Sequence, residues 1–84
     1  MCSSCKILHF YDSFRTPLQF FHEIDKVRSL VAQGDMLVEN ATLPLGEVTG
    51  SSKGLLRFEL KCTCCGQRLV LWSENGIGGN SKPL

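Results

Sequence analysis

The 84-residue sequence lacks long apolar runs and a strong excess of charge of either sign, and it has few aromatic residues. No apolar stretch approaches the roughly 20 residues of a membrane-spanning helix, so we expect no membrane partner. The formal net charge is +1, and bulk electrostatics therefore indicate no particular partner. The segment Met1 to Lys6 has no apolar core of the kind found in secretory signals, so we expect a cytoplasmic location.

The motifs of common catalytic sites are also missing. The sequence contains no nucleophile elbow, no zinc-protease motif and no P-loop. The glycine-rich run at 76–79 has Ser81 where a dinucleotide fingerprint needs its third glycine. Only two histidines are present: we expect His22 on the solvated side of a helix and His9 in a packing or hydrogen-bonding role. We therefore predict that the protein is not an enzyme.

What the sequence does contain is five cysteines in two clusters, Cys2 and Cys5, then Cys62, Cys64 and Cys65. A chain this short buries a modest core and usually needs a further constraint. An odd number of cysteines without a secretion signal argues against a disulfide framework. Tetrahedral zinc binds four thiolates at about 2.3 Å, and a C-x-x-C turn presents two of them on one side of a loop. The predicted zinc ligands are Cys2, Cys5, Cys62 and Cys65.

Cys64 lies inside the second C-x-x-C unit. Adjacent cysteines cannot easily point at one ion, so Cys64 is left out of the ligand set, although it could replace Cys62 or Cys65. Four thiolates would close the zinc shell, which indicates a structural ion. Two alternatives stay open: inert buried thiols, and a thiol redox switch that uses the spare Cys64.

Hydrophobic periodicity predicts a helix that begins after Thr16, with Pro17 in its first turn, and stops at Gly34. Glu23 and other polar residues are assigned to its solvated side. The predicted buried stripe is Phe20, Phe21, Ile24, Val27, Leu30 and Val31.

Alternating patterns predict strands at 6–11, 36–41, 55–61 and 67–73. The fold class is α+β: one helix packed on a three- to four-stranded, mainly antiparallel sheet. Residues 1–73 are expected to form a single domain, and the Gly-, Asn- and Ser-rich residues 74–84 a flexible tail.

The two cysteine units resemble those of a zinc ribbon, with an N-terminal C-x-x-C knuckle and a C-terminal C-x-x-C-G knuckle between two antiparallel strands. The resemblance implies zinc bound by Cys2, Cys5, Cys62 and Cys65. It covers the two ends of the chain, whereas the helix and strand between them depart from simple ribbons. More loosely, the layout is similar to small bacterial zinc-ribbon proteins, some of which are immunity proteins that neutralise a partner toxin.

The outer face of the predicted sheet supplies the candidate partner-binding residues Arg57, Arg68, Val70 and Trp72. Val70 and Trp72 are expected to form an exposed apolar patch, which is typical of protein interfaces. Arginines beside an aromatic ring also suit phosphate contacts and base stacking, so nucleic-acid binding is the alternative. We predict non-catalytic recognition of a macromolecule, with a protein favoured and an inhibitor or immunity protein as one form of that function.

Overall fold

The computed structural model describes residues 5–49 and 53–84. Within these residues, two short 3₁₀ segments, one helix and four strands follow each other. In order they are η1 (Cys5–Ile7), α1 (Pro17–Ala32), β1 (Met36–Ala41), η2 (Leu45–Glu47), β2 (Leu55–Cys62), β3 (Arg68–Glu74) and β4 (Ile77–Pro83).

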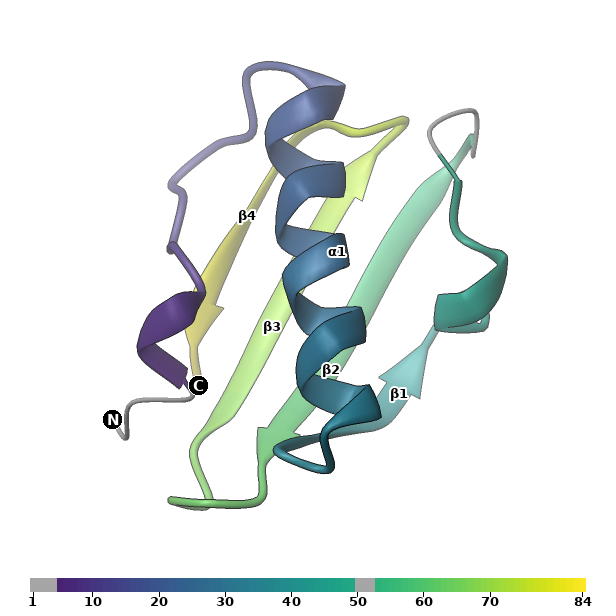
Figure 1. Ribbon diagram of the computed structural model, residues 1–84. Helices are drawn as coiled ribbons and strands as arrows, with labels where there is room; N and C mark the ends of the chain where they lie inside the picture. The colour runs from purple at the N-terminus through teal and green to yellow at the C-terminus, as the bar shows by residue number, and fades with distance from the viewer. Residues whose placement is uncertain (1–4, 50–52) are drawn as a thin grey trace.

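The four strands form one antiparallel sheet in the order β1-β2-β3-β4, and α1 lies across one face of it (Figure 1). The predicted α+β class is confirmed: one helix packs on an antiparallel sheet, which was expected to have three or four strands and has four. In the part of the chain that the structure describes, no helix has both the length and the apolar character needed to cross a bilayer.

Helix α1 begins and ends where the sequence predicts. The Thr16 hydroxyl accepts the backbone N–H of Gln19 at 3.4 Å, which satisfies one of the unpaired donors of the first turn. Pro17 occupies the first helical position, where its missing N–H costs nothing. Gln33 caps the other end, and Gly34 follows with φ +82°, a left-handed conformation that suits glycine.

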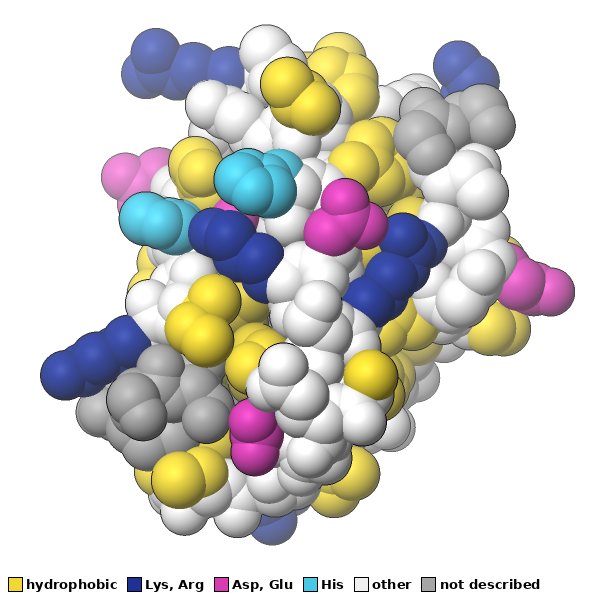
Figure 2. Space-filling view, viewed as in Figure 1, with side chains coloured by type: hydrophobic (Ala, Val, Ile, Leu, Met, Phe, Trp, Pro, Cys, Tyr) yellow, Lys and Arg dark blue, Asp and Glu magenta, His cyan; other side chains and the backbone are white. Residues whose placement is uncertain are grey.

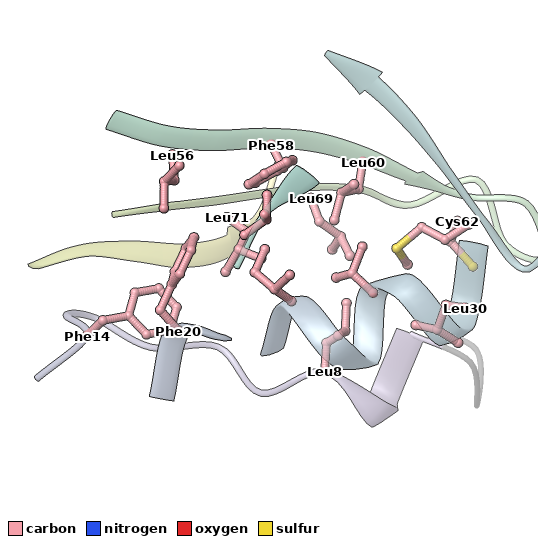
Figure 3. Packing of buried hydrophobic residues seen from close by; sticks show 14 residues of the cluster. Leu8, Phe14, Phe20, Leu30, Leu56, Phe58, Leu60, Cys62, Leu69 and Leu71 are labelled. Atoms are coloured by element: carbon pink, nitrogen blue, oxygen red, sulfur yellow. The ribbon is translucent and has the colours of Figure 1, made fainter. Parts of the chain in front are cut away.

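The apolar stripe of α1 packs against the inner face of the sheet (Figure 3). Phe20 is fully buried, and its ring lies edge-on to that of Phe14 with centroids 5.2 Å apart. Phe21 and Val31, which the sequence also predicts on the stripe, are partly buried. The core consists of Leu8, Phe14, Phe20, Ile24, Val27, Leu30, Met36, Val48, Leu56, Phe58, Leu60, Cys62, Leu69 and Leu71.

The β2–β3 hairpin has the register that a symmetric turn predicts. Phe58 pairs with Leu71 and Leu60 with Leu69, so all four side chains point toward α1. Because side chains alternate along a strand, the residues between them form the outer face of the sheet.

The strand predicted over 6–11 is wrong. After η1, residues 8–14 form an irregular segment, here called the strap, which runs beside β4 on the α1 side of the sheet (Figure 1). Its alternation of apolar and polar residues resembles that of a strand, but the backbone N–H of His9 bonds to the Glu23 side chain rather than to a neighbouring strand. A short alternating pattern does not reveal such a side-chain partner.

The expectation of a flexible tail over 74–84 is also wrong, because Ile77–Pro83 form β4 and pair with β3. The run has little alternation of apolar and polar residues, so it gives no strand signal. Gly78 and Gly79 have φ values of +71° and +68°, which only glycine adopts readily. Backbone pairing with β3, rather than apolar side chains, holds this strand in place.

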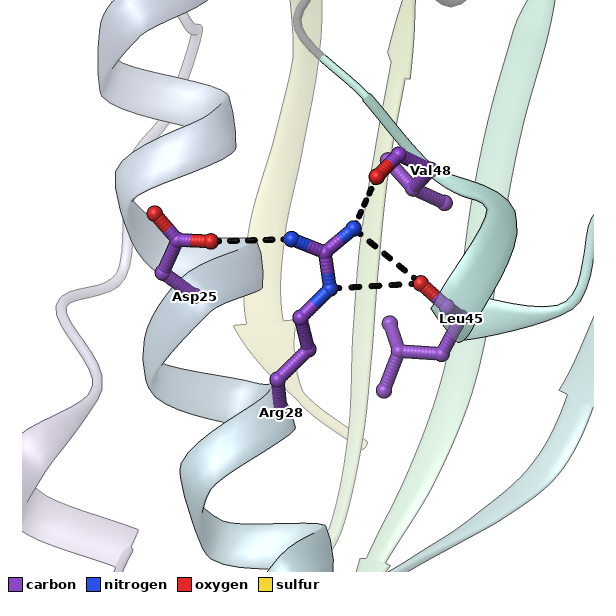
Figure 4. A network of polar contacts seen from close by, with 4 residues as sticks. All are labelled: Asp25, Arg28, Leu45 and Val48. Atoms are coloured by element: carbon purple, nitrogen blue, oxygen red, sulfur yellow. Dashed lines mark hydrogen bonds and ion pairs between the residues drawn. The ribbon is translucent and has the colours of Figure 1, made fainter.

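Arg28 fixes the segment around η2 to α1 (Figure 4). Its guanidinium donates to the carbonyl of Leu45, at 3.3 Å from Nε and 3.2 Å from Nη2, and also to the carbonyl of Val48. Nη1 lies 3.0 Å from the Asp25 carboxylate. Since the Val48 side chain belongs to the buried core, these hydrogen bonds from Arg28 help to keep Val48 packed against it.

We predict that Arg28→Met lowers the free energy of unfolding by about 1–3 kcal/mol, because hydrogen bonds from a charged donor to the two carbonyls are lost. Urea unfolding followed by circular dichroism measures the change. Asp25→Asn is the matched control: it removes only the exposed ion pair and should change stability by less than about 0.5 kcal/mol. Equal effects of the two substitutions would contradict the assigned role of the carbonyl contacts.

Candidate metal centre and outer sheet face

Three of the five cysteines lie at the end of β2 and in the turn that leads to β3. Cys62 is the last residue of β2, and its carbonyl accepts the Gly66 N–H at 2.9 Å. Gly66 has φ +76°, as expected for a chain that turns in the left-handed region after the second cysteine of the unit. Thr63 ties the turn to the residue before β1, because its N–H donates to the Asp35 carbonyl at 3.0 Å. The C-x-x-C-G unit therefore forms a tight turn.

The cysteine side chains of this turn lie in two environments. Cys62 is fully buried and lies at the same end of the core as Leu30 (Figure 3). Cys64 and Cys65 are exposed, and Cys65 lines an open depression together with Arg68. An ion shared by Cys62 and Cys65 would have to lie where the inner face of the sheet meets the turn.

The N-terminal C-x-x-C unit is only partly described. Cys2 lies outside the described residues, and of Cys5 only the backbone is described. Cys5 begins η1, which lies on the α1 side of the sheet, toward the end at which β2 terminates (Figure 1). Cys5 and Cys62 are therefore on the same face and toward the same end of the sheet, although they come from opposite ends of the sequence.

The metal site itself stays a prediction. Across residues 5–49 and 53–84, no three His, Cys, Asp or Glu side chains form a group that could hold a metal ion. Of the four predicted ligands, only Cys62 and Cys65 have described side chains, and two ligands do not complete a tetrahedral zinc site.

The outer face of the sheet, which points away from α1, carries the predicted partner-binding residues. Arg57 lies opposite Trp72 on the neighbouring strand, as expected, and its guanidinium is 3.3 Å from the Glu59 carboxylate. Arg68 lies 3.2 Å from the carboxylate of Glu39. Both arginines, the residues that would contact phosphate in the nucleic-acid alternative, are thus paired with acidic side chains.

The prediction that Val70 belongs to an exposed apolar patch is wrong, because Val70 is only 3% exposed. It lies between Glu59 on β2 and Lys82 on β4, and the aliphatic stems of such cross-strand neighbours can cover a central residue. Trp72 is half-buried, and its indole N–H donates to Asn80 Oδ1 at 3.1 Å. Lys82 and Asn80 belong to β4, the strand that the sequence did not reveal.

Glu23 is buried, although the sequence predicts it on the solvated side of α1. It is 1% exposed; its Oε1 accepts the His9 backbone N–H at 2.7 Å, and its Oε2 lies 2.9 Å from Lys26 Nζ. The burial of Glu23 could have been predicted from its position along the helix, although not from its residue type. Position 23 is three residues after Phe20 and four before Val27, which places it on the buried stripe.

The face that carries α1 is chemically mixed. Figure 2 shows basic, acidic, histidine and apolar side chains interspersed over it, without a large patch of one kind. His22 is exposed, as predicted, and His9 is exposed as well, while its backbone N–H and carbonyl hold the strap through Glu23 and Ser81.

No protein-family model matches the chain, and no curated protein or solved structure matches it either. The function proposed below therefore rests on the residues of this chain and on their placement.

Proposed function

We propose that this protein is a non-catalytic zinc-binding module that recognises another protein. The observation that carries the metal assignment is the placement of Cys5 and Cys62 toward one end of the sheet, on one face. Cys2, Cys5, Cys62 and Cys65 would hold the ion as four thiolates. Such an ion has a closed shell and supplies folding stability rather than a reactive position.

Protein recognition is favoured over nucleic-acid binding because of the charge arrangement on the outer face. A phosphate group would have to compete with Glu59 for Arg57 and with Glu39 for Arg68. Trp72 offers a half-buried ring whose polar atom already has a partner, and aromatic rings of this kind are common at protein interfaces. We extend the proposal to an inhibitor or immunity protein that acts in the cytoplasm.

We predict that the outer face binds its protein partner with weak salt dependence, and that Trp72→Ala weakens this binding about tenfold or more, as expected for an aromatic residue that carries binding energy. A partner captured on the immobilised full chain is identified, purified and titrated again by calorimetry. Trp72→Phe is the matched control, since it keeps an aromatic ring at that position and should retain most of the affinity.

The nucleic-acid alternative is tested with a random duplex and a random single strand at roughly 50 and 200 mM salt. We expect no salt-sensitive binding to either. Affinity that falls at least tenfold between these concentrations, and is lost in Arg57→Ala or Arg68→Ala, would overturn the protein assignment in favour of nucleic acid.

A further inference from the structure

Two exposed apolar side chains lie near Trp72 on the outer face, at the end of the sheet where α1 begins (Figure 1). Leu55 on β2 lies opposite Glu74 on β3, and Glu74 lies opposite Ile77 on β4. Opposite residues of antiparallel strands share a face, and Glu74 follows Trp72 by two residues, so all four point outward. Leu55 and Ile77 are each 52% exposed. Leu55, Trp72, Glu74 and Ile77 are here called the end patch.

The backbone beneath the end patch is well fixed. Asn75 and Gly76 form the turn from β3 to β4, with the left-handed φ values of +56° and +82° that suit a two-residue hairpin. A Cβ on Gly76 would lie 3.0 Å from Pro17 Cβ and 3.1 Å from Phe21 Cε2, so the turn packs against the start of α1. The Asn75 side chain accepts the Gly54 N–H at 2.6 Å, which ties the turn to the residue before β2. The end patch is therefore preorganised for binding.

Glu74 determines which chemistry suits the end patch. It is exposed, and within residues 5–49 and 53–84 its carboxylate forms no ion pair. A partner that covers Leu55 and Ile77 also covers Glu74, because Glu74 lies between them. A carboxylate that loses its water needs a cationic partner. The complementary surface therefore combines apolar groups with a Lys or Arg side chain.

A second copy of this chain fits the end patch poorly. In a two-fold dimer through this surface, the Glu74 carboxylates of the two chains would be brought together without a cation between them. A different protein can supply that cation. Since neighbouring strands are about 4.8 Å apart, Leu55 and Ile77 lie about 10 Å apart across β3. Seven residues of a helix rise by nearly the same distance, and the fourth lies on the same side between them.

We propose that the end patch binds a helix of a partner protein that carries two apolar side chains seven residues apart and a Lys or Arg between them; this rests on the protein recognition proposed above. The apolar side chains would cover Leu55 and Ile77 beside the Trp72 ring, and the basic side chain would pair with Glu74. One ion pair agrees with the weak salt dependence expected for the outer face. The end patch and the cysteine turn lie at opposite ends of β2, so partner and metal would use different residues.

The test uses the full chain as bait for a displayed library of helical peptides in which positions i, i+4 and i+7 are randomised. The wild type should select apolar residues at i and i+7 and Lys or Arg at i+4. Glu74→Lys should instead select Asp or Glu at i+4. This reversal of the charge preference would identify Glu74 as the residue that the basic side chain contacts.

Calorimetry with a selected peptide measures the individual contacts. Glu74→Lys should weaken its binding about tenfold or more, because like charges are then brought together. Glu47→Lys is the matched control: it makes the same change of charge at an exposed residue of η2, which packs beside α1, and should leave the affinity unchanged. Joint replacement of the exposed Leu55 and Ile77 by serine should also weaken binding about tenfold or more.

Several results would overturn the proposal. One is a library that yields no binder, or binders without a preference for a basic residue that Glu74→Lys binds equally well. Another is a dimer of the unliganded wild type in sedimentation that Ile77→Ser dissociates, which would assign the end patch to a second copy. Binding that requires Trp72 but not Leu55, Glu74 or Ile77 would contradict this site and leave the proposed function standing. Absence of any Trp72-dependent protein binding would contradict both.

Discussion

Cys62→Ser should abolish binding of the proposed zinc ion and leave the protein largely unfolded. Structural zinc contributes on the order of 10–16 kcal/mol in zinc-finger peptides, as much as or more than the total stability of about 5–15 kcal/mol that is usual for a domain. Native mass spectrometry should find one zinc ion per wild-type chain and none in Cys62→Ser. A zinc chelator added to the wild type should likewise lower the thermal unfolding temperature by more than 10 °C, on the order expected for a loss of several kcal/mol.

The chelator experiment separates loss of zinc from loss of packing. Cys62 is fully buried, so serine at that position would destabilise the core even without a metal. Cys64→Ser is the matched control: it replaces an exposed cysteine of the same turn and should retain both the zinc and the unfolding temperature. Loss of zinc in Cys64→Ser but not in Cys65→Ser would show that Cys64, and not Cys65, is the zinc ligand.

Metal-free wild-type protein that stays folded would contradict the zinc proposal outright. Zinc that is released reversibly by mild peroxide, in a manner that requires Cys64, would instead support the thiol redox switch.

The second large effect is expected at Gly79. A Cβ at this position would lie 2.2 Å from the Trp72 carbonyl oxygen and 2.8 Å from Ser73 Cα, both of them backbone atoms of β3. Because backbone cannot move aside as a flexible side chain can, Gly79→Ala should force β4 away from β3. We expect a loss of about 3–5 kcal/mol in unfolding free energy, from overpacking and from the strain of alanine at φ +68°.

Gly78→Ala is the control that separates these two causes. Gly78 also has a left-handed φ, +71°, but a Cβ there meets nothing within 4 Å. It should therefore cost only about 1 kcal/mol of backbone strain. Thermal unfolding of the two variants measures the difference, and equal shifts would show that the close approach of β4 to β3 at Gly79 is not a constraint on the fold.

Local signals determined α1 and the β2–β3 hairpin. Thr16 and Pro17 mark the start of the helix, and its end at Gly34 follows from a glycine in the left-handed region. In β2, alternation sets Phe58 and Leu60 on one face, and a short turn then fixes their partners on β3. These features need only neighbouring residues, so they can be predicted from the sequence.

The strap and β4 depend instead on residues far apart in the chain. The Tyr11 N–H bonds to the hydroxyl of Ser81, 70 residues away. No local pattern marks such a pair, and the glycines of β4 give no apolar alternation. The predicted sheet of three or four strands therefore includes residues 6–11, which form no strand, and omits β4.

By itself, the sequence determined the helix, the central hairpin and a spacing of cysteines that predicts zinc. Only the tertiary structure decided that Cys62 faces the core at the end of the sheet where η1 lies, that Val70 is covered, and that Glu23 lies beneath the strap. The physical reason is that spacing along the chain fixes which way a side chain points from its own element, whereas burial depends on which distant segment packs over it.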